Sequence, residues 1–250
     1  HLNIYLLKYQ FLKNMLKQGM ISQPEFEGAD RAPITARRHN RDIEITAPYV
    51  AEMVRQQLYE EYGEQAYSQG FEVVTSIDGN KQLAANQALI NGLENYYDKR
   101  HGYRGATATY PPELHADQNG NALESWIDEL QLVPVFGNQQ PAIVSSVSEL
   151  SFEAVLKSGQ LVRVEWEGMR WARTFISRNN AWPPPTVAAD AVQAGDLVRL
   201  KFTDNGWELG QVPDIQGALV SMSPSNGEII ALVGGYDFRR SQVNRAITPR

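Results

Sequence analysis

Residues 141–166 read PAIVSSVSELSFEAVLKSGQLVRVEW, and apolar side chains alternate with polar ones along much of this stretch. A period of two is typical of β-strands that bury one face. Lys157-Ser158-Gly159 interrupts the alternation with residues that suit a hairpin turn. The pattern predicts strands at 142–147, 152–156 and 160–166.

Two more strands are predicted downstream, at 196–202 and 207–212, with Asp204-Asn205-Gly206 as the turn between them. A longer excursion, residues 167–194, separates these strands from the first three, and the triple proline at 183–185 marks an exposed stretch inside it. Five short strands with one such excursion suit a small Greek-key barrel of the OB type.

The residues before the barrel predict mainly helices, because apolar positions recur there with helical spacing and Pro and Gly fall at sites that start and stop helices. A region of helix, strand and helix is typical of a small α+β linker module. The predicted elements are helices at 4–18, from Ser22 onward, at 48–62 and at 80–97, a strand at 71–77, a loop at 98–120, and a short helix to Leu130 capped by Asn121 and Glu124.

The last part of the chain predicts a β-hairpin, with strands at 217–223 and 228–233 around Pro224-Ser-Asn-Gly227. An isolated hairpin is only marginally stable in water, and its open edges invite self-association. We therefore expect this hairpin either to dock on the barrel or to be disordered.

The charge balance argues against nucleic acid as a partner. The chain has 23 basic and 29 acidic residues and a net charge of −6, whereas binding to a polyanion draws its strength from Lys and Arg. The densest basic cluster, Arg37, Arg38 and Arg41, is interpreted as a solvated loop.

Cysteine is absent, so neither a disulfide nor a thiolate metal site can form. No run of 18 apolar residues occurs, so the sequence predicts membrane attachment only through an N-terminal anchor outside this stretch.

No catalytic motif is complete in this chain. Lys157-Ser158-Gly159 matches the K-[ST]-G triplet of penicillin-recognising enzymes, but that triplet acts beside a serine with lysine three residues later, and no serine here has one. His1, His39, His101 and His115 lack the spacing of metal ligands. The sequence therefore predicts no catalytic residue and no cofactor.

Asp117-x-Asn119-x-Asn121 resembles the first half of a calcium-binding loop. The glycine needed at the sixth position is replaced by Ala122. The interpretation favoured is a polar turn before a capped helix, with no metal site.

Five aromatic residues of the barrel have two interpretations. Alternation places about half of them in the core, which is the favoured interpretation, while the others form a stacking surface for sugars or bases. The set is Phe152, Trp166, Trp171, Phe202 and Trp207, and the candidates for a binding face are Trp166, Trp171 and Trp207.

Several stretches, in order along the chain, resemble class A penicillin-binding proteins of the 1A type. They cover most of residues 12–246, and the last one together with the loop Arg100-His-Gly-Tyr-Arg-Gly105 is quite specific. The stretches are NMLKQGMISQ at 14–23, APYVAEMVR at 47–55, VTSID at 74–78, YDKRHGYRG at 97–105, EGMRWAR at 167–173 and ALVSMSPSNGEIIALVGGYDF at 218–238.

The resemblance implies a bifunctional peptidoglycan synthase on the periplasmic side of the bacterial inner membrane. Its glycosyltransferase glutamates would precede His1 and its S-x-x-K serine would follow Arg250, so the chain is expected to be an inactive internal scaffold. Implied partners are peptidoglycan or lipid II and envelope activator proteins. The implied domains are a glycosyltransferase tail at 1–32, an α+β linker at 33–110, an OB-like domain at 111–216 and the start of a transpeptidase domain at 217–250.

Two alternatives stay open. The chain is also compatible with a stand-alone module that binds peptidoglycan or a regulatory protein. An OB-type binder of nucleic acid is the third hypothesis, which the acidic balance disfavours.

Overall fold

The computed structural model describes residues 4–32, 45–112, 122–177 and 180–248. The chain divides into two compact units, His1–Ile43 and Glu44–Arg250, and each is described by itself. Candidate residues at 37–41, 115, 117, 119 and 121, with the predicted Asn121 cap, lie outside the described residues.

The first unit is a helical hairpin of α1 (Ile4–Lys17) and α2 (Gln23–Arg31). Its turn contains Gly19 at a φ of 71°, which glycine adopts without strain. The backbone N–H and hydroxyl of Ser22 both donate to the Glu25 carboxylate, each over 2.7 Å. This local bonding confirms the predicted start of the second helix.

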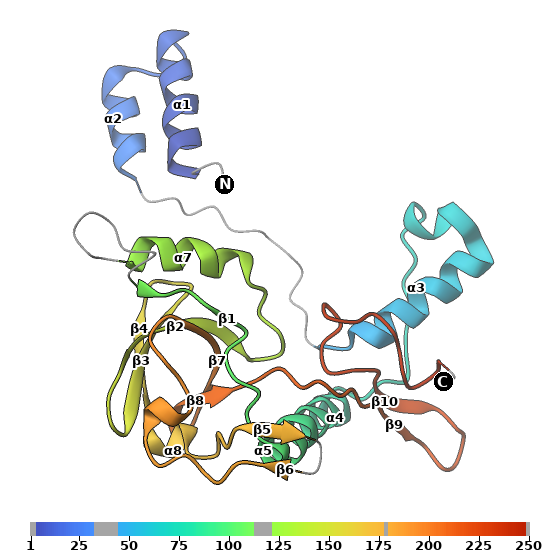
Figure 1. The fold of residues 1–250 in the computed structure, drawn as a ribbon. Coiled ribbons are helices and arrows are strands. Elements are labelled where there is room, and N and C mark those ends of the chain that lie inside the picture. The colour runs from blue at the N-terminus through green and yellow to red at the C-terminus, as the bar shows by residue number, and fades with distance from the viewer. Residues whose placement is uncertain (1–3, 33–44, 113–121, 178–179, 249–250) are drawn as a thin grey trace. The chain divides into compact units, whose positions relative to one another are not determined.

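A closed barrel dominates the second unit (Figure 1). Neighbouring strands pair antiparallel except β4 and β8, which pair in parallel, and the β7–β8 pairing completes the ring. This topology confirms the predicted OB-like barrel, within a mixed α and β fold. The strands are β2 (Gln140–Val147), β3 (Ser151–Leu156), β4 (Leu161–Glu165), β7 (Asp196–Thr203) and β8 (Gly206–Gly210).

Short elements surround this ring. Helix α7 (Leu123–Leu132) lies above the barrel in Figure 1. Its Trp126 and Leu130 belong to an apolar cluster that is separate from the one inside the barrel. The excursion contains α8 (Trp166–Met169), β5 (Phe175–Ser177), β6 (Asn180–Ala181) and η3 (Ala188–Asp190). Strand β1 (Ala108–Thr109) pairs with β7, so the region predicted as a loop at 98–120 contains a strand.

The linker consists of α3 (Pro48–Tyr62), η1 (Gly63–Tyr67), α4 (Gly79–Asn91), the π-helix η2 (Gly92–Asp98) and α5 (Lys99–His101). The Asp78 side chain caps α4 by accepting from the Lys81 N–H over 3.0 Å, as predicted. The sequence therefore located the helix at 80–97 but not its change of pitch. The helical spacing of apolar residues predicts that Leu83 faces inward, but the residue is 58% exposed.

The strand predicted at 71–77 is wrong. Residues 69–78 form no β-ladder, and Val74 is 90% exposed. Only the end of this segment contacts a strand: the Asp78 N–H donates to Ile230 O over 2.9 Å and the Ser76 hydroxyl to Ile229 O over 2.8 Å. Alternating residues form a strand only where a partner strand supplies the ladder.

The predicted hairpin forms, with β9 (Leu219–Met222) and β10 (Ile229–Val233). Neither expected outcome holds, since the hairpin is ordered and packs on helix α4 instead of the barrel. Ala85 and Leu89 of α4 contact Ala231, Val233 and Leu219. The small Ala85 side chain allows this close approach, which the local sequence of the hairpin does not reveal.

Candidate functional site: a polar junction of linker, barrel and hairpin

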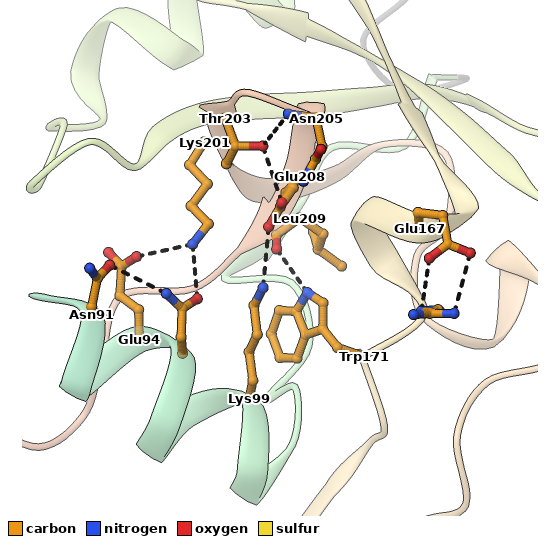
Figure 2. Close-up of polar contacts among 12 residues, drawn as sticks. Asn91, Glu94, Lys99, Glu167, Trp171, Lys201, Thr203, Asn205, Glu208 and Leu209 are labelled. Carbon is orange, nitrogen blue, oxygen red and sulfur yellow. Dashed lines mark hydrogen bonds and ion pairs between the residues drawn. The ribbon is translucent and has the colours of Figure 1, made fainter.

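The inward face of η2 meets the barrel (Figure 2) and, through Tyr236, the segment that follows the hairpin. Glu94 and Asp98 on this face are 4% and 1% exposed, although carboxylates are seldom buried without partners. A π-helical stretch is rare and often marks a functional site. We call the partners of these carboxylates, Arg104, Lys201 and Tyr236, together with Glu94 and Asp98, the junction.

Glu94 bonds both to the barrel and to the segment that follows the hairpin. Tyr236 comes after β10, and its hydroxyl donates to Glu94 Oε1 over 2.6 Å. Lys201 of β7 places its Nζ 3.4 Å from Glu94 Oε2 and 3.2 Å from Asn95 Oδ1, as Figure 2 shows for the lysine and Glu94. Burial raises the pKa of Tyr236, with the Glu94 charge adding to the shift, so the phenol stays a proton donor at neutral pH.

Asp98 holds the start of the barrel domain. Arg104 donates to both of its carboxylate oxygens, over 3.0 and 3.2 Å, and also to Val212 O over 2.7 Å. Burial raises the pKa of Asp98, although the hydrogen bonds and charge of Arg104 oppose this effect. A bidentate pair of this kind fixes the orientation of both side chains.

A third contact joins α5 to the barrel. Lys99 Nζ lies 3.2 Å from Glu208 Oε2 and 5.6 Å from the centre of the Trp171 ring. Glu208 also accepts from the Thr203 hydroxyl over 3.1 Å, and Figure 2 shows the lysine pointing at this carboxylate. The linker thus contacts β8 as well as β7.

Gln82 fixes the hairpin to α4 by bonding to both backbone groups of Leu232. Its amide donates to Leu232 O over 3.0 Å and its carbonyl accepts from Leu232 N–H over 2.9 Å. Gln82 is 1% exposed. The side chain therefore replaces the partner that a further strand would supply.

Asp237 connects the hairpin segment to the barrel domain. Its Oδ2 accepts from the Gly137 N–H over 2.6 Å and from Arg239 over 2.9 Å. Burial raises the pKa of this carboxyl, but the hydrogen bonds from Arg239 and Gly137 outweigh burial, and its pKa lies below the usual range. The ionised carboxylate is the form that holds this contact.

The three tryptophans predicted as candidates for a binding face are each partly buried against the barrel core. They are Trp166, Trp171 and Trp207. The Trp171 indole N–H donates to Leu209 O over 3.0 Å, and the Trp207 ring meets Phe202 edge to face at 5.2 Å. Phe152 is 1% exposed and Phe202 is 66% exposed. This placement agrees with the favoured core interpretation, and a binding role for the tryptophans stays a prediction.

Lys157-Ser158-Gly159 forms the predicted turn between β3 and β4, with Gly159 at a φ of 80° and its N–H donating to Leu156 O over 2.9 Å.

Within the described residues, no three His, Cys, Asp or Glu side chains cluster closely enough to hold a metal ion. No helix in the same part of the chain is long and apolar enough to cross a bilayer.

Comparison with known proteins agrees with this architecture. Residues 103–215 match the penicillin-binding protein OB-like domain. The chain is 38% identical to penicillin-binding protein 1A of Pseudomonas aeruginosa over 94% of its own length and 28% of that relative. Its identity to penicillin-binding protein 1A of Escherichia coli is also 38%, over 94% of this chain and 27% of the relative.

A crystal structure of penicillin-binding protein 1A from Haemophilus influenzae shares the fold, with a TM-score of 0.71 and 32% identity over 95% of this chain and 33% of that one. The chain is similar to the penicillin-binding proteins along nearly its whole length, and residues 103–215 match their OB-like domain. Among these proteins the similarity is to the penicillin-binding protein 1A type. It spans 28% of the length of the Pseudomonas relative.

Proposed function

We propose that this stretch is the noncatalytic scaffold of a peptidoglycan synthase, which sets the spacing between a glycan-polymerising centre and a peptide-crosslinking centre. The observation that carries the proposal is the bonding of Glu94 to both Lys201 and Tyr236. A single buried carboxylate of the linker thereby contacts the barrel and the hairpin segment. Such a contact makes the geometry of three modules interdependent.

We infer from the similarity to penicillin-binding protein 1A that this scaffold lies on the periplasmic side of the inner membrane, in contact with peptidoglycan or lipid II. An envelope activator protein is a further proposed partner. The implied domain limits at residues 32, 110 and 216 belong to the same proposal.

The test is to assay the purified 250-residue chain for penicillin acylation and for lipid II polymerisation. A full-length relative serves as the positive control for both assays. We expect no labelling by a fluorescent penicillin and no glycan product, because Lys157-Ser158-Gly159 is a hairpin turn without a serine–lysine pair. Stoichiometric labelling, or turnover of lipid II, would contradict the proposal.

A further inference from the structure

One pocket of about 560 Å³ lies on the outer side of η2, away from the residues of the junction. We call it the Arg100 pocket. It is lined by Tyr96, Tyr97, Arg100, His101, Arg173 and Asn180. The segment 96–101 supplies one wall, and residues near β5 and β6 supply the other.

The loop Arg100-His-Gly-Tyr-Arg-Gly105 divides between structure and pocket. Tyr103 is 3% exposed in the barrel core, and Arg104 belongs to the junction. Gly102 has a φ of 106°, and a methyl group there would lie 2.6 Å from Arg173 O, so only glycine fits. No comparable backbone contact restricts the residue type at Arg100 or His101, and both line the pocket.

The charge of the pocket is unbalanced. Two arginines and a histidine line it, and none of the described residues that line it is acidic, in a chain whose net charge is −6. Within the described residues, other exposed arginines such as Arg163 and Arg170 pair with a nearby glutamate. Neither Arg100 nor Arg173 has an ion-pair partner in that same part of the chain.

The existing contacts leave donors available. Arg173 donates to Arg100 O through Nη2 over 2.6 Å, which uses one of the five N–H groups of a guanidinium. Arg100 lies 5.9 Å from the centre of the Tyr96 ring, and Tyr96 is 70% exposed. The Tyr97 and His101 rings stack at 4.0 Å, with His101 Nδ1 bonded to Tyr97 O.

We propose that the Arg100 pocket binds a carboxylate-bearing muropeptide, meaning an amino-sugar unit with its stem peptide. Planar guanidinium groups bind carboxylates through paired hydrogen bonds, and the exposed tyrosine ring offers a flat apolar surface to the ligand. The inference rests on the proposed function, because a peptidoglycan synthase is surrounded by this chemistry. The pocket would give the scaffold its own hold on nascent cell wall.

The experiment is titration of the purified chain, followed by NMR and calorimetry, with three probes. They are a disaccharide tetrapeptide, the same disaccharide without peptide, and inorganic phosphate. We expect the disaccharide tetrapeptide to bind most tightly and to shift the signals of Tyr96, Arg100 and Arg173. Equal or tighter binding of phosphate or of the bare disaccharide would overturn the proposal, as would no binding of the peptide-bearing probe at millimolar concentration.

Arg100→Gln is expected to weaken binding of the disaccharide tetrapeptide at least tenfold, and Tyr96→Ala, which removes the exposed ring beside Arg100, several-fold. Arg170→Gln is the matched control, because it removes the same charge from an exposed site outside the pocket. The affinity of this variant for the disaccharide tetrapeptide is expected to stay within twofold of the wild-type value. Equal weakening by Arg170→Gln would show nonspecific charge attraction. Failure here leaves the scaffold proposal intact, because that proposal is tested by the absence of catalysis.

Discussion

Gln82 holds β10 with a side chain where a sheet would use a neighbouring strand. Both polar groups of its amide bond to the backbone of Leu232, and the residue is buried. A buried donor or acceptor that loses its partner costs about 1–3 kcal/mol. Gln82→Ala therefore orphans two backbone groups at once.

We expect Gln82→Ala to lower the free energy of unfolding by about 2–4 kcal/mol, as measured by urea denaturation. Gln87→Ala is the control, because it makes the same change on an exposed position of the same helix. Its effect is expected to stay within about 0.5 kcal/mol. Equal effects of the two substitutions would show that the buried amide does not anchor the hairpin.

Asp237 predicts a dependence on pH. Its pKa is lowered in the folded chain, net of burial, by hydrogen bonds from Arg239 and Gly137, so its stabilising contribution is present above the unfolded pKa of about 3.9 and is lost as the pH falls through the folded value. The difference in the free energy of unfolding between wild type and Asp237→Asn should be full at pH 7 and should shrink below pH 4.

Urea denaturation at several pH values measures this difference. Asp204→Asn, in the exposed turn between β7 and β8, is the control and should show no comparable loss. A wild-type advantage over Asp237→Asn that is unchanged at pH 3 would argue against the ionised contact with Gly137.

At the scale of the element, α8 lies close to β8 because it contains a glycine. A methyl group added to Gly168 would lie 2.7 Å from Trp207 O and 3.2 Å from Glu208 Cα, and backbone atoms do not move aside easily. Alanine in a helix is otherwise favoured over glycine by about 1 kcal/mol. The clash decides the sign, since overpacking costs about 1–3 kcal/mol.

Gly168→Ala is therefore expected to lower the melting temperature of the barrel, followed by tryptophan fluorescence. Gly92→Ala, where the added methyl group meets nothing within 4 Å, should be neutral or slightly stabilising. A Gly168→Ala variant as stable as wild type would mean that α8 does not pack tightly on β8.

The barrel strands were predictable because their signals are local. The short apolar runs in β2, β3 and β7, the alternation in β4, and the turns at Gly159 and Gly206 are visible in adjacent residues. The helix start at Asp78 was found in the same way. The segment 71–77 misled the prediction because alternation alone cannot show that a partner strand is missing.

The junction was not predictable from the sequence, because its contacts join residues far apart in the chain. Glu94 is separated from Tyr236 by 142 positions and from Lys201 by 107. A glutamate in a helix, followed by the polar Asn95, is expected to be solvated. Its burial follows only from the π-helical pitch of η2 and from the docking of the barrel beside it.

At the scale of the whole second unit, linker, barrel and hairpin are expected to unfold as one cooperative body. Tyr236→Phe removes only the hydroxyl that donates to Glu94, and it should cost about 1–3 kcal/mol by leaving a buried carboxylate oxygen short of a partner. Tyr59→Phe is the matched control, because that tyrosine also donates to a glutamate, Glu64, but at an exposed site.

Hydrogen exchange followed by mass spectrometry tests this most directly, on peptides from α4, β7 and β10. In Tyr236→Phe, protection should fall by a similar factor in all three segments, and in Tyr59→Phe it should stay at the wild-type level. Loss of protection confined to β10, with α4 and β7 unchanged, would contradict the claim that the junction unites the three modules.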